Sequence, residues 1–98
     1  MRYISTRDPR AAPPAYSFEE VLLAGLAEDG GLYVPETSPA LDFESLAGLP
    51  YAELTARVVA PFAAGSFGRD ELRRLCAAAY GGFAHAAVAP LVQLDQRL

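Results

Sequence analysis

The hydrophobic residues of the chain follow a helical spacing in several segments. In the stretch "YSFEEVLLAGLAEDGG" they recur at every third or fourth position, as Phe18, Val21, Leu22, Gly25 and Leu26. This spacing places them on one face of a helix. Ser17 and Glu20 ahead of the run have the S-x-x-E spacing of a capping box. A helix is therefore predicted to begin near Phe18.

Two more segments with helical spacing follow in the second half of the sequence. In "YAELTARVVAPFAAG" one face is apolar, and Pro61 should kink or end the helix because proline deletes a hydrogen bond and crowds the preceding turn. The next segment is the most periodic in the chain, with a stripe of Leu72, Leu75, Cys76, Ala79, Tyr80 and Phe83. Gly81-Gly82 should end that helix. Leu75 lies in the middle of the stripe and is predicted to be a core residue.

The shorter elements are marked by proline and by capping residues. Residues 2–5 are predicted to form a strand, which the prolines of "DPRAAPP" cannot continue. The stretch "LYVP" is predicted to be a short extended piece, and residues 91–94 a short strand. A short helix is predicted at residues 42–47 with Asp42 as its N-cap.

The stretch "LAEDGGLYVPE" admits three interpretations: a hairpin turn, a phosphate-binding loop or a helix stop. A two-residue hairpin needs strands on both sides, whereas Asp29, Gly30 and Gly31 follow a segment with helical spacing. A phosphate loop generally leads into a helix, and these glycines leave one. The helix stop is therefore favoured, with Gly30 or Gly31 at positive φ at or just beyond the C-cap.

Composition narrows the classes of function. The chain has 98 residues, 52% of them hydrophobic, which is typical of one globular domain. Its net charge of −4 does not favour binding to the negatively charged backbone of nucleic acid, so no nucleic-acid partner is expected. No apolar run approaches the roughly 18 residues of a membrane helix, so no membrane partner is expected. The N-terminus lacks the apolar core of a secretion signal and Cys76 has no disulfide partner, which favours a cytoplasmic protein.

Candidate catalytic groups are few. His85, the only histidine, has no second ligand at metal-binding spacing, so a structural or solvent-facing role is favoured. Cys76 lies on the apolar stripe, where a buried, inert thiol is favoured over a nucleophile. Every basic residue is arginine, so no lysine can form an imine with an aldehyde cofactor. The sequence therefore assigns no catalytic, cofactor-binding or metal-binding residue.

Four fragments together resemble the N-terminus of threonine synthase, the pyridoxal-phosphate enzyme that converts O-phosphohomoserine and water to threonine and phosphate. They are "YISTR", "SFEEVLLAGLAEDGGLYVPE", "YAELTARVVAPF" and "FAHAAVAPLVQLD", and they run along essentially the whole chain. The second is the most specific, because its helix, double glycine and "LYVP" exit occur in the family's order. Asp8 and Pro9 follow "STR" where the family commonly has glycine, so the loop at residues 8–14 is expected to take another path.

The resemblance implies an α+β fold for residues 1–98: a small single domain with four or so helices packed with a short two- to three-stranded sheet. The family's cofactor lysine lies downstream of "PLVQLD". This chain alone is therefore expected to hold no cofactor and to be inactive, and pyridoxal phosphate and the lyase chemistry of threonine biosynthesis belong to the full-length parent. The chain then resembles an N-terminal scaffold or docking domain whose partners are the remaining domains of that enzyme. The alternative is a freestanding, non-catalytic protein-binding module with the same fold.

The polar cluster of Ser5, Thr6 and Arg7 gains interest from this resemblance, because arginine binds phosphate well and the parent substrate carries one. Hydrogen bonds at a strand end, or contact with the remaining domains, are favoured over a contact with the substrate phosphate. Arg73 and Arg74 are expected to form a solvated face opposite the apolar stripe.

Overall fold

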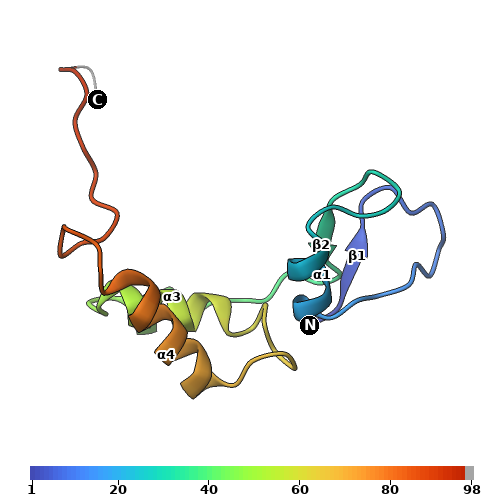
Figure 1. Ribbon diagram of the computed structural model, residues 1–98, viewed down its shortest axis with the longest axis horizontal. Helices are drawn as coiled ribbons and strands as arrows, with labels where there is room; N and C mark the ends of the chain where they lie inside the picture. The colour runs from blue at the N-terminus through green and yellow to red at the C-terminus, as the bar shows by residue number, and fades with distance from the viewer. Residues whose placement is uncertain (97–98) are drawn as a thin grey trace.

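A computed structural model of the protein describes residues 1–96, which form four helices and a two-stranded sheet (Figure 1). In chain order the elements are β1 (Tyr3–Ser5), α1 (Phe18–Ala24), β2 (Tyr33–Pro35), α2 (Phe43–Leu46), α3 (Tyr51–Val59) and α4 (Arg69–Tyr80). The arrangement confirms the predicted α+β class, with two strands in the sheet. No helix among residues 1–96 is long and apolar enough to cross a lipid bilayer.

The sheet joins the two predicted extended segments. β1 and β2 are antiparallel, with Tyr3 opposite Pro35 and Ser5 opposite Tyr33. Tyr16 adds a further bridge, since its N–H and C=O both pair with Tyr3 at 2.9 Å. The loop rich in proline therefore leaves β1 and returns to it just before α1.

The capping box starts α1 at the predicted place. The Ser17 hydroxyl accepts the N–H of Glu20 at 3.2 Å, and the Glu20 carboxylate accepts the N–H of Ser17 at 2.7 Å. Two N–H groups that have no partner inside the helix are thereby satisfied.

The end of α1 differs from the prediction, because the helix stops at Ala24 and not at Gly30 or Gly31. Gly25 takes a φ of 75°, and its N–H still donates to the carbonyl four residues before it at 3.0 Å. Gly30 does have a positive φ, 80°, but in a separate turn in which its N–H donates to the carbonyl of Ala27 at 3.0 Å. The helix-stop interpretation of the glycine pair is therefore wrong: the first glycine that the chain offers, Gly25, ends the helix.

The remaining helices follow the predicted boundaries closely. Asp42 caps α2 by accepting the N–H of Glu44 at 3.2 Å. α3 ends at Val59, shortly before Pro61. α4 ends at Tyr80, next to the glycine pair.

The core lies between α3 and α4 and contains Ala56, Ala63, Leu72 and Cys76. Cys76 is buried there as predicted, whereas Leu75 is 50% exposed and Leu72 only 6%. The prediction of Leu75 as a core residue is wrong. Because α4 packs mainly on α3, only the side of its apolar stripe that meets α3 is buried.

The loop between α3 and α4 joins the helical pair to the sheet. The hydroxyl of the buried Tyr3 donates to the carbonyl of Phe62 at 2.7 Å, and the N-terminal ammonium donates to that of Ala64 at 3.0 Å. The rings of Phe18 and Phe67 meet edge to face with centroids 6.1 Å apart. Contacts with this loop thus fix β1 and α1 against the helical pair.

The molecule encloses little apolar volume. Its radius of gyration is 16.7 Å, whereas a compact domain of this length has about 13 Å. No large side chain among residues 1–96 is fully buried. Much of the apolar surface of the chain therefore faces solvent.

The strand predicted at residues 91–94 is not formed. In Figure 1 the chain beyond α4 runs away from the helices without a strand alongside it. A strand needs a neighbour to take up its backbone hydrogen bonds, and none of the described residues supplies one.

Candidate functional site

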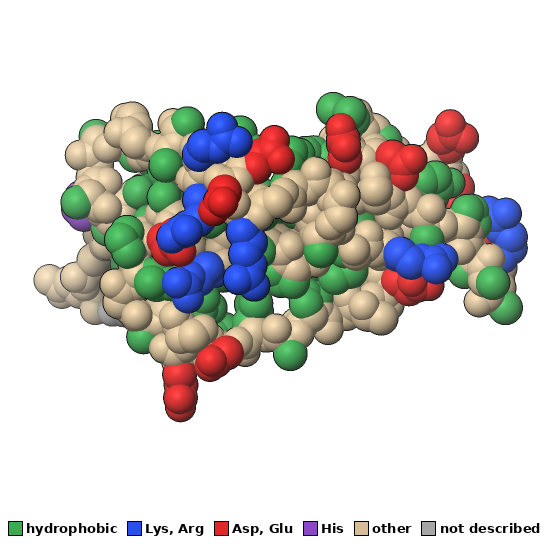
Figure 2. Space-filling view, turned by 90° about the horizontal axis from the view of Figure 1, so that it is seen from below, with side chains coloured by type: hydrophobic (Ala, Val, Ile, Leu, Met, Phe, Trp, Pro, Cys, Tyr) green, Lys and Arg blue, Asp and Glu red, His purple; other side chains and the backbone are tan. Residues whose placement is uncertain are grey.

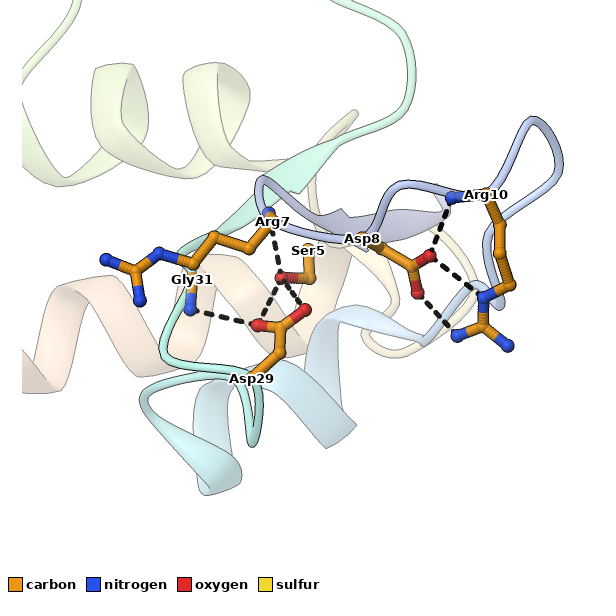
Figure 3. Close-up of polar contacts among 6 residues, drawn as sticks. All are labelled: Ser5, Arg7, Asp8, Arg10, Asp29 and Gly31. Carbon is orange, nitrogen blue, oxygen red and sulfur yellow. Dashed lines mark hydrogen bonds and ion pairs between the residues drawn. The ribbon is translucent and has the colours of Figure 1, made fainter.

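A polar cluster joins the end of β1 to the turn before β2 (Figure 3). The Ser5 hydroxyl donates to the Asp29 carboxylate, with Oγ 2.7 and 2.9 Å from its two oxygens, and accepts the N–H of Arg7 at 3.3 Å. The same carboxylate accepts the N–H of Gly31 at 2.9 Å. The Asp29 side chain therefore fastens the turn that contains Gly30 and Gly31, called here the glycine turn, to the end of β1.

Thr6 fastens the next residue of that turn. Its N–H donates to the carbonyl of Leu32 at 2.9 Å, and its hydroxyl accepts the N–H of Leu32 at 2.9 Å. The N–H groups of Gly30, Gly31 and Leu32 are thus all bound within the chain. An anion at this turn would have to displace these partners, which disfavours the phosphate-loop interpretation.

The carboxylates of the cluster are held in their ionised form. The hydrogen bond from Ser5, followed by that from the Gly31 N–H, lowers the pKa of Asp29. Hydrogen bonds from the side chain and backbone of Arg10 lower the pKa of Asp8 to about 2. Both groups stay negative at neutral pH.

The link between Asp29 and Ser5 was missed by the sequence analysis, which treated Asp29 only as part of a helix stop. The available signal was an aspartate directly before two glycines, because aspartate often binds backbone N–H groups two residues on. That signal predicts the contact with Gly31. It does not predict Ser5, which is distant in the sequence.

Arg7 differs from its neighbours because its side chain forms no hydrogen bond or ion pair with any residue that the structure describes. Its guanidinium lies over the glycine turn, where a methyl group on Gly30 would stand 2.7 Å from Nη1. In Figure 3 the side chain points away from Asp29. Of the three residues singled out in the sequence, two fasten the turn and Arg7 presents its charge to solvent.

A depression of about 240 Å³ opens beside the cluster. It is lined by Ser5, Asp8, Arg10, Tyr16, Ala27, Glu28, Asp29 and Tyr33. Tyr16 and Tyr33 meet edge to face on its wall, with centroids 5.4 Å apart. Its carboxylates outnumber its one guanidinium, so the depression is a poor environment for phosphate.

A larger groove of about 830 Å³ runs between α2 and the α3–α4 pair. Within it Glu53 on α3 accepts hydrogen bonds from Arg73 at 2.8 Å and Arg57 at 3.2 Å, and these lower the pKa of Glu53. Arg73 therefore connects α4 to α3 while its side chain stays 57% exposed, in agreement with the predicted solvated face. Figure 2 shows basic side chains gathered in this part of the molecule with acidic ones among them. The groove is consequently not a strongly basic surface.

The remaining chemically active side chains are not assembled into a centre. His85 is exposed, and its Nδ1 accepts the N–H of Ala87 at 3.0 Å. Cys76 is buried in the core between α3 and α4. Among residues 1–96, no three His, Cys, Asp or Glu side chains are grouped as a metal site would require.

Comparison with known proteins gives one family. The sequence model described as "Threonine synthase N terminus" matches residues 2–80. Threonine synthase of Pseudomonas aeruginosa is 55% identical over 97% of this chain and 20% of its own length. That of Corynebacterium glutamicum is 36% identical over 100% of the chain and 22% of its own length.

A solved structure extends the likeness to three dimensions. The pyridoxal-phosphate-bound threonine synthase of Brucella melitensis superposes with a TM-score of 0.81 at 41% identity, over 98% of this chain and 21% of that enzyme. The chain thus spans about a fifth of the length of the relatives that it matches. The resemblance found in the sequence is confirmed, and the chain belongs to the threonine synthase N-terminal family.

Proposed function

We propose that residues 1–98 act as one N-terminal scaffold and docking domain of a threonine synthase, the enzyme that makes threonine and phosphate from O-phosphohomoserine and water. The observation that carries this proposal is coverage: threonine synthases match 97–100% of this chain, which corresponds to only 20–22% of their length. The partners of the domain are then the remaining parts of that enzyme. The reducing cytoplasm, predicted from the lone Cys76, is the proposed location.

The exposed apolar surface of the domain supports a docking role. Four leucines on and after α1 are exposed, and together they are named the α1 surface: Leu22, Leu23, Leu26 and Leu32. Leu22 is 60% exposed and Leu26 67%. Each buried leucine side chain is worth roughly 1.5–3 kcal/mol, so covering this surface would stabilise both the domain and its partner.

The residues present do not fit pyridoxal phosphate. The chain has no lysine with which to form an imine. The N–H groups of the glycine turn are bound, and the depression beside it carries Asp8, Glu28 and Asp29. The proposal therefore places the cofactor in the rest of the enzyme and makes this domain inactive by itself.

Within this function we assign different tasks to the three residues of the polar cluster. Ser5 and Thr6 position the turn between Ala27 and β2. Arg7, whose guanidinium is exposed, contacts the remaining domains. Arg7→Gln should therefore weaken the assembled enzyme thermally with little change in KM for O-phosphohomoserine; a raised KM with unchanged stability would point to a contact with the substrate phosphate instead.

The test is a chimera in which this chain replaces the matching fifth of the P. aeruginosa threonine synthase. The expected result is threonine formation within tenfold of the parent enzyme. The 98-residue chain alone, given pyridoxal phosphate and O-phosphohomoserine, should release no phosphate. Phosphate release by the isolated chain would contradict the inactive-domain assignment, and a folded but inactive chimera would favour a freestanding binding module.

A further inference from the structure

The chain beyond α4, residues 81–96, is the least enclosed part of the molecule. It contains a turn directly after α4, in which the N–H of Phe83 donates to the carbonyl of Tyr80 at 3.2 Å, and a second turn, in which the N–H of Val88 donates to the carbonyl of His85 at 2.9 Å. After it Leu91, Val92 and Leu94 are 104%, 69% and 86% exposed. Three large apolar side chains within four residues are thus not covered by any of residues 1–96.

The backbone of this stretch also lacks partners. The N–H and C=O groups of residues 91–94 form no hydrogen bond within the described part of the chain. In an extended chain alternate residues face opposite sides, which puts Val92 and Leu94 on one side and Leu91 on the other. Apolar residues on both sides are typical of a strand that is buried on both faces. Exposed to water, such a stretch has neither its hydrogen bonds nor its burial.

The comparisons indicate where the missing neighbour lies. The N-terminal family model stops at Tyr80, which is also the last residue of α4. Whole threonine synthases nevertheless match 97–98% of the chain, a share that reaches well beyond Tyr80. Residues 81–96 are therefore shared with the complete enzyme while lying outside the N-terminal module.

We propose that residues 91–94 form a β-strand by pairing with an exposed backbone edge in the part of threonine synthase that this chain lacks. The pairing would supply the hydrogen bonds that the stretch lacks here, and the surrounding enzyme would bury its leucines and valine. This mode of docking, in which a segment adds a strand to another sheet, draws affinity from the backbone and specificity from alternate side chains. The inference rests on the proposed docking function and identifies one of its contacts.

The first measurement is residue-resolved amide hydrogen exchange on the isolated chain and on the chimera. In the isolated chain the amides of residues 91–94 should exchange as fast as an unstructured peptide. In the chimera at least every second one should slow by about a hundredfold or more, because amides in a ladder open rarely. Equal, fast exchange in both samples would overturn the strand.

The second measurement uses proline, which removes one N–H. Neighbouring residues in a strand direct their N–H groups to opposite edges, so Val92→Pro and Gln93→Pro should differ if one edge is paired. One of the two chimeras should lose most of its thermal stability and the other should lose less. Ala86→Pro is the matched control, because no described hydrogen bond uses the Ala86 N–H and its place in the turn suits proline.

The two proposals fail in different ways. An active chimera with fast exchange at residues 91–94, or with both proline variants as stable as Ala86→Pro, overturns the strand and leaves the docking function intact. An inactive chimera contradicts the docking function. Amide hydrogen exchange on that same sample still tests whether residues 91–94 form a strand. Slow exchange there supports the strand, and fast exchange overturns it.

Discussion

Residues 1–80 and residues 81–96 obey the same local rules with different results. In the first region the capping box of α1 and the Asp42 cap of α2 form as the sequence indicates, and β1 finds β2. In the second region an apolar stretch of strand-forming residues stays extended and exposed. The difference lies in the neighbours: in the first region β1 pairs with β2 and α3 packs on α4, whereas the stretch at residues 91–94 has no partner among residues 1–96.

The same contrast exists inside the first region. Leu72 on α4 meets α3 and is buried, whereas the α1 surface faces solvent although its leucines are as apolar. Hydrophobicity shows that a residue gains from burial, but it does not show which surface provides it. Under the proposed docking function, the exposed apolar residues of this domain are the places where another part of the enzyme would fit.

The largest effect is expected in the core. Leu72→Ala should destabilise the isolated chain by roughly 2–5 kcal/mol, because a buried leucine leaves a cavity. Leu75→Ala on the same helix should cost less than about 1 kcal/mol, since that side chain is already half in solvent. Chemical denaturation of both variants measures the difference. Equal losses would show that Leu75 is enclosed in solution and would remove the contrast between the two positions.

A smaller effect is expected at the glycine turn. A methyl group on Gly31 would overlap with Oγ of Ser5 and stand 3.0 Å from the backbone nitrogen of Arg7. Gly31→Ala should therefore cost about 1–3 kcal/mol, as overpacking usually does. Gly82→Ala is the control, because a methyl group there meets nothing within 4 Å. If the two variants unfold at the same denaturant concentration, the turn is not fastened to β1.

The glycine pair also shows why the sequence analysis partly failed. The positive φ of one glycine was predicted correctly from its sequence context, and Gly30 has it. The role was wrong, because an earlier glycine at position 25 could end the helix and the pair was left to bind back to β1. Helix capping is a local property and is readable over a few residues. The contact between Ser5 and Asp29 joins distant positions, and no local pattern indicates it.

The predictions of Leu75 as a core residue and of residues 91–94 as a strand failed for a related reason. Their spacing correctly indicated which residues share a face, and Cys76 and Leu72 are indeed buried on that helix. The spacing of apolar residues does not show how much of a helix face its neighbour covers. The main neighbour of α4 is α3, which covers only part of the apolar stripe. For residues 91–94 a strand was predicted from composition, but a strand exists only as a pair. No catalytic or metal-binding residue was assigned from the sequence, and the polar cluster remains a proposed structural and docking feature.

The smallest effect is a pH dependence at the same turn. The folded-state pKa of Asp29 lies below its unfolded value of about 3.9. Its ionised form therefore stabilises the fold above that pH, and this contribution is lost as the pH falls through the folded-state pKa. The hydrogen bond from Ser5 is the main cause of the lowered pKa. Ser5→Ala removes this hydrogen bond, so the pKa of Asp29 should rise toward its ordinary value in an NMR titration of the carboxyl groups. Asp8, which Arg10 holds, should keep its pKa of about 2; an unchanged Asp29 would show that Ser5 does not hold it.

The docking of the α1 surface on the rest of threonine synthase can be measured by thiol labelling of a Leu22→Cys variant. In the isolated chain this cysteine should react at nearly the rate of a free thiol, with the buried Cys76 as the slow internal reference. In the chimera with the P. aeruginosa enzyme the introduced thiol should react at least tenfold more slowly, because the partner covers it. If the introduced thiol reacts equally fast in the isolated chain and in an active chimera, docking through the α1 surface is contradicted, since α1 would then remain exposed in the working enzyme.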